Sequence, residues 1–238
     1  MQLNDDLHVV PLSTVRDGQT VTYNPSLILD PTHGHTLVDT GLPGQLEQIA
    51  SALSAASVQV ADLKRVVITH QDIDHVGSLH DVVKASAALV LAHEVEVPFI
   101  DGTEQPRFAR PEMLASRPEL RAVVERFQPT PVDRSLQDGS RLEMAGGVRV
   151  VFTPGHTIGH MCLYLERSGT VIAGDALTAS EGRLQGPNPN ATSDMATAAR
   201  SVQKLAELDV RAIVCYHGGV VHDDAGGQLR RLAEELGR

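Results

Sequence analysis

The segment from Thr69 to Gly77 constrains this chain more than any other, because it places four candidate metal ligands within six residues. These are His70, Asp72, Asp74 and His75. The segment follows Val66-Val67-Ile68, a short β-branched apolar run that is typical of a buried strand. If the extended backbone continues, the first three ligands share one face, and a turn brings the fourth towards them. Imidazole and carboxylate donors at this density favour a divalent transition metal over a polar loop held by capping hydrogen bonds.

Five motifs, in the same order along the chain, resemble those of the metallo-β-lactamase-fold superfamily. They are Val38-Asp39-Thr40-Gly41, Thr69 to Gly77, Thr153 to His160, Ala173-Gly174-Asp175 and Tyr216-His217-Gly218-Gly219. The second resembles the superfamily signature His-x-His-x-Asp-His, except that Asp72 stands where most members carry a His. The resemblance implies an α/β fold, the αββα sandwich, with two mixed sheets face to face, helices on the outer faces and the site in loops at one edge.

The resemblance also implies a site for two divalent ions. The first ion would be held by His70, Asp72 and His156, the second by Asp74, His75 and His217, with Asp175 bridging. Zinc is the first expectation, but the additional oxygen donor of Asp72 shifts the preference towards manganese or iron and could leave only one position filled. Asp39 would orient ligands without touching an ion, and His160 would lie behind the ligands or in the core.

The implied reaction is hydrolysis of an ester, thioester or lactone by a hydroxide that bridges the two ions, with Asp74 steering the hydroxide and relaying its proton. We favour a glyoxalase II-like or lactonase-like branch, of thioesterase or lactonase type, over a β-lactamase, because no export signal is visible. Two other functions stay open at this stage. One is that of a mononuclear iron enzyme resembling the sulfur dioxygenases, and the other is metal-dependent ligand binding without catalysis.

Composition limits the partners. The formal net charge is −10, with 20 Lys and Arg against 30 Asp and Glu, which argues against binding nucleic acid or an anionic membrane. Residues Met1 to Asp6 have neither a basic nor an apolar character, and no apolar run approaches the length of a membrane span. We therefore expect a cytoplasmic protein. Cys162 and Cys215 each lie in an apolar run and are expected to be buried thiols.

Residues 1–238 are treated as one domain with an insertion at about residues 98–131. The insertion is rich in Pro, lacks strand alternation and is predicted to be a loop plus a helix with the apolar stripe Leu120, Val123, Val124 and Phe127. A lid over the site, a structural cap and a homodimer contact are equal alternatives for it. A lid containing three of the four Phe residues would favour a small-molecule substrate with an apolar portion.

The remaining pattern predicts strands and helices in alternation. Two β-rich segments, Leu7 to Val15 and Val21 to Leu29, are separated by Arg16-Asp17-Gly18-Gln19, whose Asp-Gly pair suits a hairpin turn. Leu46, Ile49, Ala50 and Leu53 recur at helical spacing, and Ser78 can cap a second helix.

Overall fold

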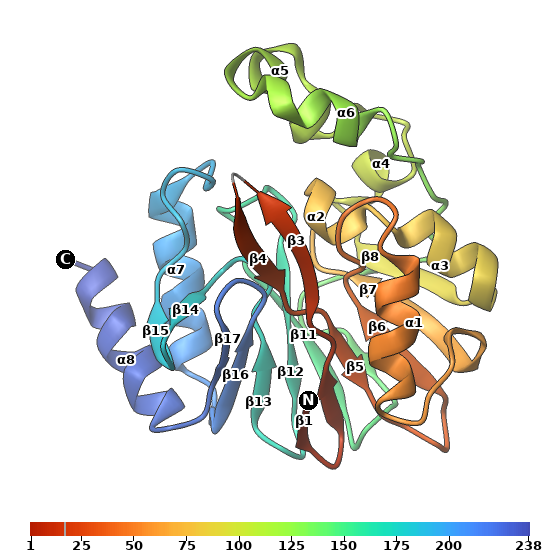
Figure 1. Ribbon diagram of the computed structural model, residues 1–238. Helices are drawn as coiled ribbons and strands as arrows, with labels where there is room; N and C mark the ends of the chain where they lie inside the picture. The colour runs from red at the N-terminus through yellow and green to blue at the C-terminus, as the bar shows by residue number, and fades with distance from the viewer. Residues whose placement is uncertain (17) are drawn as a thin grey trace.

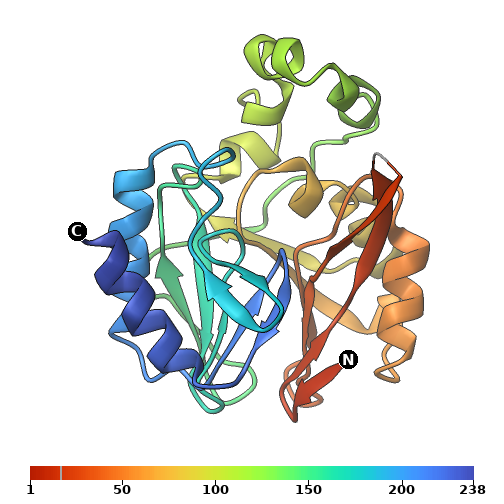
Figure 2. The same cartoon turned by 60° about the vertical axis from the view of Figure 1, so that its left-hand side comes forward.

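The computed structural model describes residues 1–16 and 18–238 and consists of two facing β-sheets with helices on their outer faces (Figure 1). A second view shows the two layers of strands between the outer helices (Figure 2). The expected α/β class and αββα sandwich are therefore confirmed.

The first sheet has seven strands in the order β1-β2-β5-β6-β7-β8-β9. They are β1 (Gln2–Asn4), β2 (Leu7–Val9), β5 (Ser26–Ile28), β6 (His35–Val38), β7 (Leu63–Ile68), β8 (Leu89–His93) and β9 (Arg134–Leu136). Pairing is antiparallel from β1 to β6 and parallel from β6 to β9. Because β6 and β7 are parallel neighbours, the motifs that follow them, at Asp39 and at Thr69 to Gly77, lie together at one edge.

The second sheet has six strands in the order β10-β11-β12-β13-β16-β17, all antiparallel except the parallel pair β13 and β16. They are β10 (Arg141–Leu142), β11 (Val148–Phe152), β12 (Met161–Leu165), β13 (Thr170–Ile172), β16 (Ala212–Cys215) and β17 (Gly219–Val221). The parallel pair brings the loops after β13 and β16, which contain Asp175 and His217, to the same edge as the loops of the first sheet.

Two hairpins stand beside the sheets. They are β3 (Leu12–Arg16) with β4 (Gln19–Tyr23), and β14 (Thr178–Ser180) with β15 (Arg183–Gln185). Arg16 pairs with Gln19 in antiparallel register, which confirms the predicted first hairpin, although Asp17 of its turn lies outside the described residues.

Four longer helices cover the outer faces. They are α1 (Leu46–Ser54) and α3 (Leu79–Ser86) on the first sheet, and α7 (Met195–Ala206) and α8 (Ala225–Leu236) on the second (Figure 1). A short 3-10 helix, η1 (Val60–Asp62), precedes β7, and α2 (Ile73–Val76) follows it. Within the described residues, none of the helices combines the length and the apolar character that crossing a bilayer requires.

The insertion stands above the sheet edge and contains five short helices (Figure 1). They are α4 (Val97–Ile100), η2 (Arg107–Ala109), α5 (Pro111–Ser116), η3 (Pro118–Leu120) and α6 (Arg121–Val124). The predicted stripe that ends at Phe127 is helical only as far as Val124, and a turn follows it, in which the Phe127 N–H donates to the carbonyl of Val124 at 3.0 Å. Phe127 packs edge-on against Phe108, with ring centroids 5.2 Å apart, so the stripe anchors the insertion by this aromatic contact instead of by a long helix.

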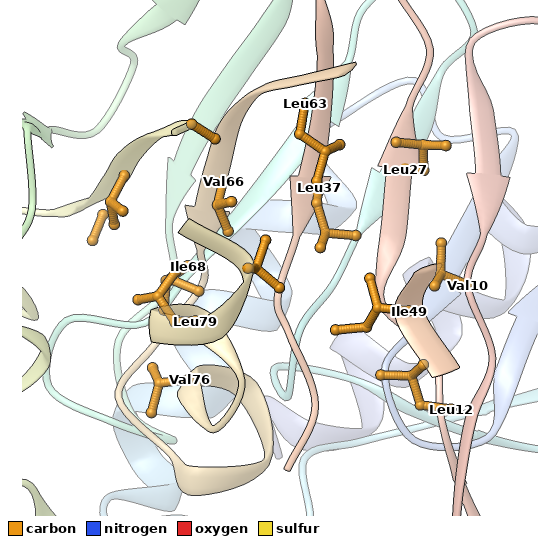
Figure 3. Packing of buried hydrophobic residues seen from close by; sticks show 14 of the residues in the cluster. Val10, Leu12, Leu27, Leu37, Ile49, Leu63, Val66, Ile68, Val76 and Leu79 are labelled. Atoms are coloured by element: carbon orange, nitrogen blue, oxygen red, sulfur yellow. The ribbon is translucent and has the colours of Figure 1, made fainter. Parts of the chain in front are cut away.

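Alternation along the strands divides the apolar side chains into three layers. In β7, Val66 and Ile68 face the helices of the first sheet, whereas Val67 faces the second sheet. In β12, Leu163 points between the sheets and Cys162 points towards α7 and α8. Figure 3 shows the first of these layers, in which Leu37 and Val66 of the sheet lie near Ile49 and Leu79 of the helices.

Replacing Leu37 by Ala should destabilise the protein, because this side chain is fully buried between β6 and the helices. We expect a loss of about 2–5 kcal/mol in the free energy of unfolding, measured by urea denaturation. Leu89→Ala is the matched control, since Leu89 lies in β8 but is 55% exposed, and it should change stability by less than about 0.5 kcal/mol. Equal losses in the two variants would contradict the layer assignment.

Candidate metal centre

The backbone changes direction directly after β7. The strand ends at Ile68, and Asp72 begins the helical turn α2, with its carbonyl accepting hydrogen bonds from the N–H groups of His75 at 2.8 Å and Val76 at 3.0 Å. The expectation that His70, Asp72 and Asp74 share the face of a strand is therefore wrong. The helical turn instead places Asp74 and His75 on adjacent helical positions, where both reach the sheet edge.

All seven predicted ligands lie there, and six of them fall into two candidate ion-binding groups. The first group consists of His70, His156 and Asp175, and the second group consists of Asp74, His75 and His217. Within each group the donor atoms lie within 4.8 Å of one another. Asp175 lies between the groups, because its Oδ1 is 3.1 Å from Nε2 of His75 and its Oδ2 is 3.4 Å from Nε2 of His156 and 3.3 Å from Nε2 of His217. The seventh residue, Asp72, lies beside His70 and His156, with its Oδ2 3.5 Å from Nε2 of His70 and 3.2 Å from Nε2 of His156, and it also forms an ion pair with Arg107.

Several of these donor atoms have no hydrogen-bond partner. Among the described residues, Nε2 of His70, Nε2 of His75 and Oδ1 of Asp175 are buried and form no hydrogen bond of good geometry, although His75 and Asp175 lie 3.1 Å apart and His70 lies 3.5 Å from Asp72. An unsatisfied buried polar atom costs about 1–3 kcal/mol, so three of them in one place indicate a binding site for an electrophile. A divalent cation fits this combination of nitrogen and oxygen donors.

His75 is held from behind by Asp39, as predicted for that carboxylate. Oδ2 of Asp39 lies 2.9 Å from Nδ1 of His75, and both side chains are buried. The carboxylate also accepts hydrogen bonds from the backbone N–H of Thr69 at 2.9 Å and from its hydroxyl at 2.8 Å. Because Nδ1 is occupied in this way, Nε2 of His75 is the nitrogen that faces the centre.

The electrostatics of the centre are dominated by buried acid and imidazole groups. Burial alone would lower the pKa of His75, but the carboxylates of Asp39 and Asp175 raise it well above its ordinary value. Burial would raise the pKa of Asp175, yet the neighbouring His217, His75 and His156 hold it well below its usual range. The carboxylate is therefore ionised and attracts positive charge.

His160 lies behind the ligands. Burial and the nearby His70 hold the pKa of His160 well below its usual range, so the ring is neutral. Its Nε2 accepts a hydrogen bond from the backbone N–H of Asp175 at 3.0 Å, and its Nδ1 is 2.9 Å from the hydroxyl of Thr153. These contacts place His160 as a support for the Asp175 loop, as the sequence indicated.

Glycine is required in the loop that delivers His156. Gly155 has φ +129°, and a Cβ at this position would lie 2.3 Å from the backbone nitrogen of Ala198 in α7. The absence of a side chain thus allows the loop to pack directly on the helix and to direct His156 towards the centre.

Sequence reasoning missed Glu96, which joins two of the loops. Its buried carboxylate accepts hydrogen bonds from the N–H of Gln71 at 3.0 Å, the N–H of Gly159 at 2.9 Å and the hydroxyl of Thr157 at 2.6 Å. Burial raises the pKa of Glu96 despite these bonds. Glu96 lies outside the five motifs, so no local pattern could have identified it.

Sequence reasoning also missed Arg107, which comes from η2 of the insertion. Its guanidinium makes a two-pronged ion pair with Asp72, and its Nη2 lies 2.8 Å from Nε2 of His156. The positive charge of Arg107 holds the pKa of Asp72 well below its usual range, although burial opposes this. A carboxylate in place of the superfamily's His was a signal that a cationic partner could exist, but nothing in the sequence indicated which cation.

The two groups therefore differ in their fitness for an ion. Asp74, His75 and His217, together with Asp175, offer two nitrogen and two oxygen donors that no cationic side chain contacts within the part of the chain the structure describes. In the other group, Nε2 of His156 is already in contact with Arg107. The second group, with Asp175, therefore fits a metal ion, and the first group does not.

A cavity of about 500 Å³ opens beside the centre. Its wall combines Asp72, Asp74 and Arg107 with residues of the insertion and of the β3–β4 hairpin. The apolar part of the wall includes Leu42, Ile73, Phe108, Met113 and Leu120. The insertion thus forms one side of the cavity next to the candidate ligands.

Comparison with known proteins shows the family of this chain. The family model described as "Metallo-beta-lactamase superfamily" matches residues 20–217. Members of this superfamily typically bind divalent metals. The chain is 28% identical over 206 residues to the "Probable metallo-hydrolase YflN" of Bacillus subtilis, a match that covers 78% of this chain and 76% of that protein. It is 24% identical over 206 residues to an "Atrochrysone carboxyl ACP thioesterase" of Aspergillus fumigatus, covering 85% of this chain but only 51% of that protein.

Solved structures show the same architecture. A metallo-beta-lactamase family protein from Thermus thermophilus superposes with a TM-score of 0.74 at 29% identity, covering 99% of this chain and 79% of that one. A metallo-beta-lactamase from Pontibacter korlensis superposes with a TM-score of 0.71 at 15% identity, covering 98% and 97%, which shows likeness of fold alone.

Replacing Asp39 by Asn should weaken zinc binding about 10–100-fold, because Asn removes the negative charge behind His75 while keeping the shape of the side chain. Asn also tolerates the left-handed backbone of this position, where φ is +63°. The affinity is measured by competition with a chromophoric chelator. Asp30→Asn is the control, since Asp30 is also buried but interacts with His33 and Ala145, and its zinc affinity should equal that of the wild type. Unchanged affinity in Asp39→Asn would contradict this role.

Proposed function

The chain belongs to the metallo-beta-lactamase superfamily, and from this premise we propose that it is a metal-dependent hydrolase that cleaves an ester, thioester or lactone. The observation that carries the proposal is the convergence of Asp74, His75, Asp175 and His217 beside a cavity, with unpartnered buried donor atoms among them. The similarity of the chain to a probable metallo-hydrolase and to a thioesterase supports hydrolysis. The similarity to the thioesterase favours a thioester among the three substrate classes.

The expected hydrolysis depends on a divalent ion and on a few side chains around it. When bound, a divalent ion would supply positive charge that acidifies a water molecule and polarises a carbonyl group. Asp74 lines the cavity, and its Oδ2 is 3.5 Å from Nε2 of His217. We assign to this oxygen the task of orienting the attacking water and accepting its proton.

Tyr216 keeps Asp74 and His75 in place for this task. Its hydroxyl donates a hydrogen bond to the backbone carbonyl of Asp74, and its ring stacks on that of His75 with centroids 3.8 Å apart. Burial and the nearby Asp74 raise the pKa of Tyr216 well above its usual value, so the hydroxyl remains a donor. Tyr216 therefore positions the α2 turn and takes no direct part in proton transfer.

The substrate is proposed to be a small molecule with an apolar portion. Phe108, Met113 and Leu120 of the insertion line the cavity next to Asp74, so an acyl chain bound there would contact them while its carbonyl faces the centre. This arrangement favours the interpretation of the insertion as a wall of the substrate site over the alternatives of a structural cap and a homodimer contact.

Chelation followed by a substrate panel tests the function. Protein treated with EDTA should lose hydrolysis of thioesters, esters or lactones, and added zinc or manganese should restore it. Asp74→Asn should reduce kcat about 10²–10⁴-fold with the fold retained, whereas Asp209→Asn, a change of an exposed carboxylate, should not alter kcat. Metal-dependent oxygen uptake without hydrolysis would identify an iron dioxygenase instead, and tight ligand retention without turnover would identify a binding protein.

The apolar wall is tested by acyl-chain length. Leu120→Ser should raise KM for an octanoyl thioester roughly 10-fold, because loss of the apolar contact costs about 1.5 kcal/mol, and should leave KM for the acetyl thioester unchanged. Leu114→Ser is the matched control, since Leu114 lies in the same insertion, is partly buried and does not line the cavity. An equal KM change for both chain lengths would contradict contact between the acyl chain and Leu120.

A further inference from the structure

Arg107 lies on the side of the centre where the first group of donors would hold an ion. Its side chain is only 16% exposed, and every nitrogen of its guanidinium has a partner. Nε donates to Oδ1 of Asp72 at 2.5 Å, and Nη2 donates to Oδ2 of the same carboxylate. Nη1 donates to the carbonyls of His156 at 2.8 Å and Ala191 at 3.0 Å and to the hydroxyl of Ser193 at 3.0 Å. This number of contacts fixes the guanidinium in one orientation.

The contact with His156 uses the donor atom that an ion would need. Arginine has only N–H donors, so Nε2 of His156 is the acceptor in its 2.8 Å contact with Nη2 of Arg107. A metal would have to approach the same lone pair to about 2.0–2.1 Å, which the guanidinium prevents. Oδ2 of Asp72, which lies 3.2 Å from the same nitrogen, is engaged by Arg107 as well.

With His156 in contact with Arg107, only two donor residues of the first group are left, and two are too few to hold a second metal ion. Nε2 of His70 forms no hydrogen bond of good geometry within the described chain and lies 3.5 Å from Oδ2 of Asp72, and Asp175 is shared with the second group. A closed ion site needs about four ligands, or three and a water. The second group reaches that number with Asp74, His75, His217 and Asp175, and none of its donor atoms is in contact with Arg107 in the described residues.

The charges agree with this division. A single divalent ion would balance the carboxylates of Asp74 and Asp175, and Arg107 balances Asp72. A second divalent ion at the first group would lie next to the guanidinium of Arg107, and like charges at that distance repel each other.

We propose that the guanidinium of Arg107 takes the place of one metal ion, so that this protein binds one divalent ion per chain, held by Asp74, His75, Asp175 and His217. The inference rests on the proposed metal dependence, and it specifies the number and position of the ions. It also explains the carboxylate at Asp72, which serves as the partner of a built-in cation and not as a metal ligand.

Metal counting on the full chain tests this proposal. Wild-type protein is stripped, reloaded with excess Zn²⁺, desalted and analysed by plasma mass spectrometry, with one zinc per chain expected. Arg107→Ala frees Asp72 and His156 and should raise the count towards two, as should the double variant Arg107→Ala/Asp72→His, which replaces the carboxylate by imidazole. Arg110→Ala, which removes a different arginine from the same cavity wall, should keep one zinc.

Spectroscopy gives a second readout that does not depend on activity. Mn²⁺-loaded wild type should show the six-line spectrum of an isolated ion in electron paramagnetic resonance, and Arg107→Ala should show exchange-coupled signals. Circular dichroism of each variant shows whether it is folded. The number of zinc ions per wild-type chain can be measured without any variant. Two ions in the wild type would overturn the proposal while leaving the hydrolase function intact. A count of one in both folded Arg107 variants would also overturn it. If the one-ion wild type hydrolyses none of the panel, the proposed function fails and the assignment of Arg107 stands.

Discussion

The buried contact between Asp39 and His75 is the constraint on which the remainder of the centre depends. A carboxylate that is 1% exposed is tolerated only when its charge and its lone pairs are satisfied, and here Thr69 and His75 satisfy them. This is possible because β6 and β7 are parallel neighbours with Val38 opposite Val67, so the residues after both strands meet. The strand register of the first sheet therefore determines which nitrogen of His75 faces the centre.

The two sheets contribute different halves of the centre, and their loops must be held at a fixed separation. Glu96, after β8 of the first sheet, binds both the Gln71 backbone and the Thr157–Gly159 loop that follows β11 of the second. Asp175, after β13, contacts His75 of the first sheet and His217 of the second. Buried polar contacts of this kind are costly when one member is missing, so they make the relative position of the loops specific.

The sequence predicts those parts of the structure that depend on local patterns. Strand alternation and helical spacing are local, which explains why β7, α1 and the helix after Ser78 lie where the pattern indicated, although the Ser78 hydroxyl does not cap that helix and instead donates to the carbonyl of Leu42. The seven predicted ligands converge because each lies in a motif at the end of a strand. Arg107 and Glu96 could not be predicted, since their partners are 35 and 25 or more residues away and no periodicity records such a pairing. The helical turn α2 was also missed, because its four residues are too few for the spacing of apolar side chains to distinguish a helix from a strand.

The comparison between Asp72 and Asp175 shows how the same kind of residue can serve two purposes. Both carboxylates are ionised at the centre, and the pKa of each is held well below its usual range by neighbouring positive groups. The counter-ion of Asp72 is Arg107, with which it forms an ion pair. Because Arg107 is a side chain of the same protein, a chelator cannot remove it. Asp175 is surrounded by three imidazoles, and one of its oxygens forms no hydrogen bond, so this carboxylate is open to a cation from outside the chain. Because Arg107 belongs to the insertion that also lines the cavity, one segment supplies both a wall of the cavity and the positive charge beside His156. Under the proposed one-ion arrangement, the metal content and the shape of the substrate site would therefore depend on the same segment of the chain.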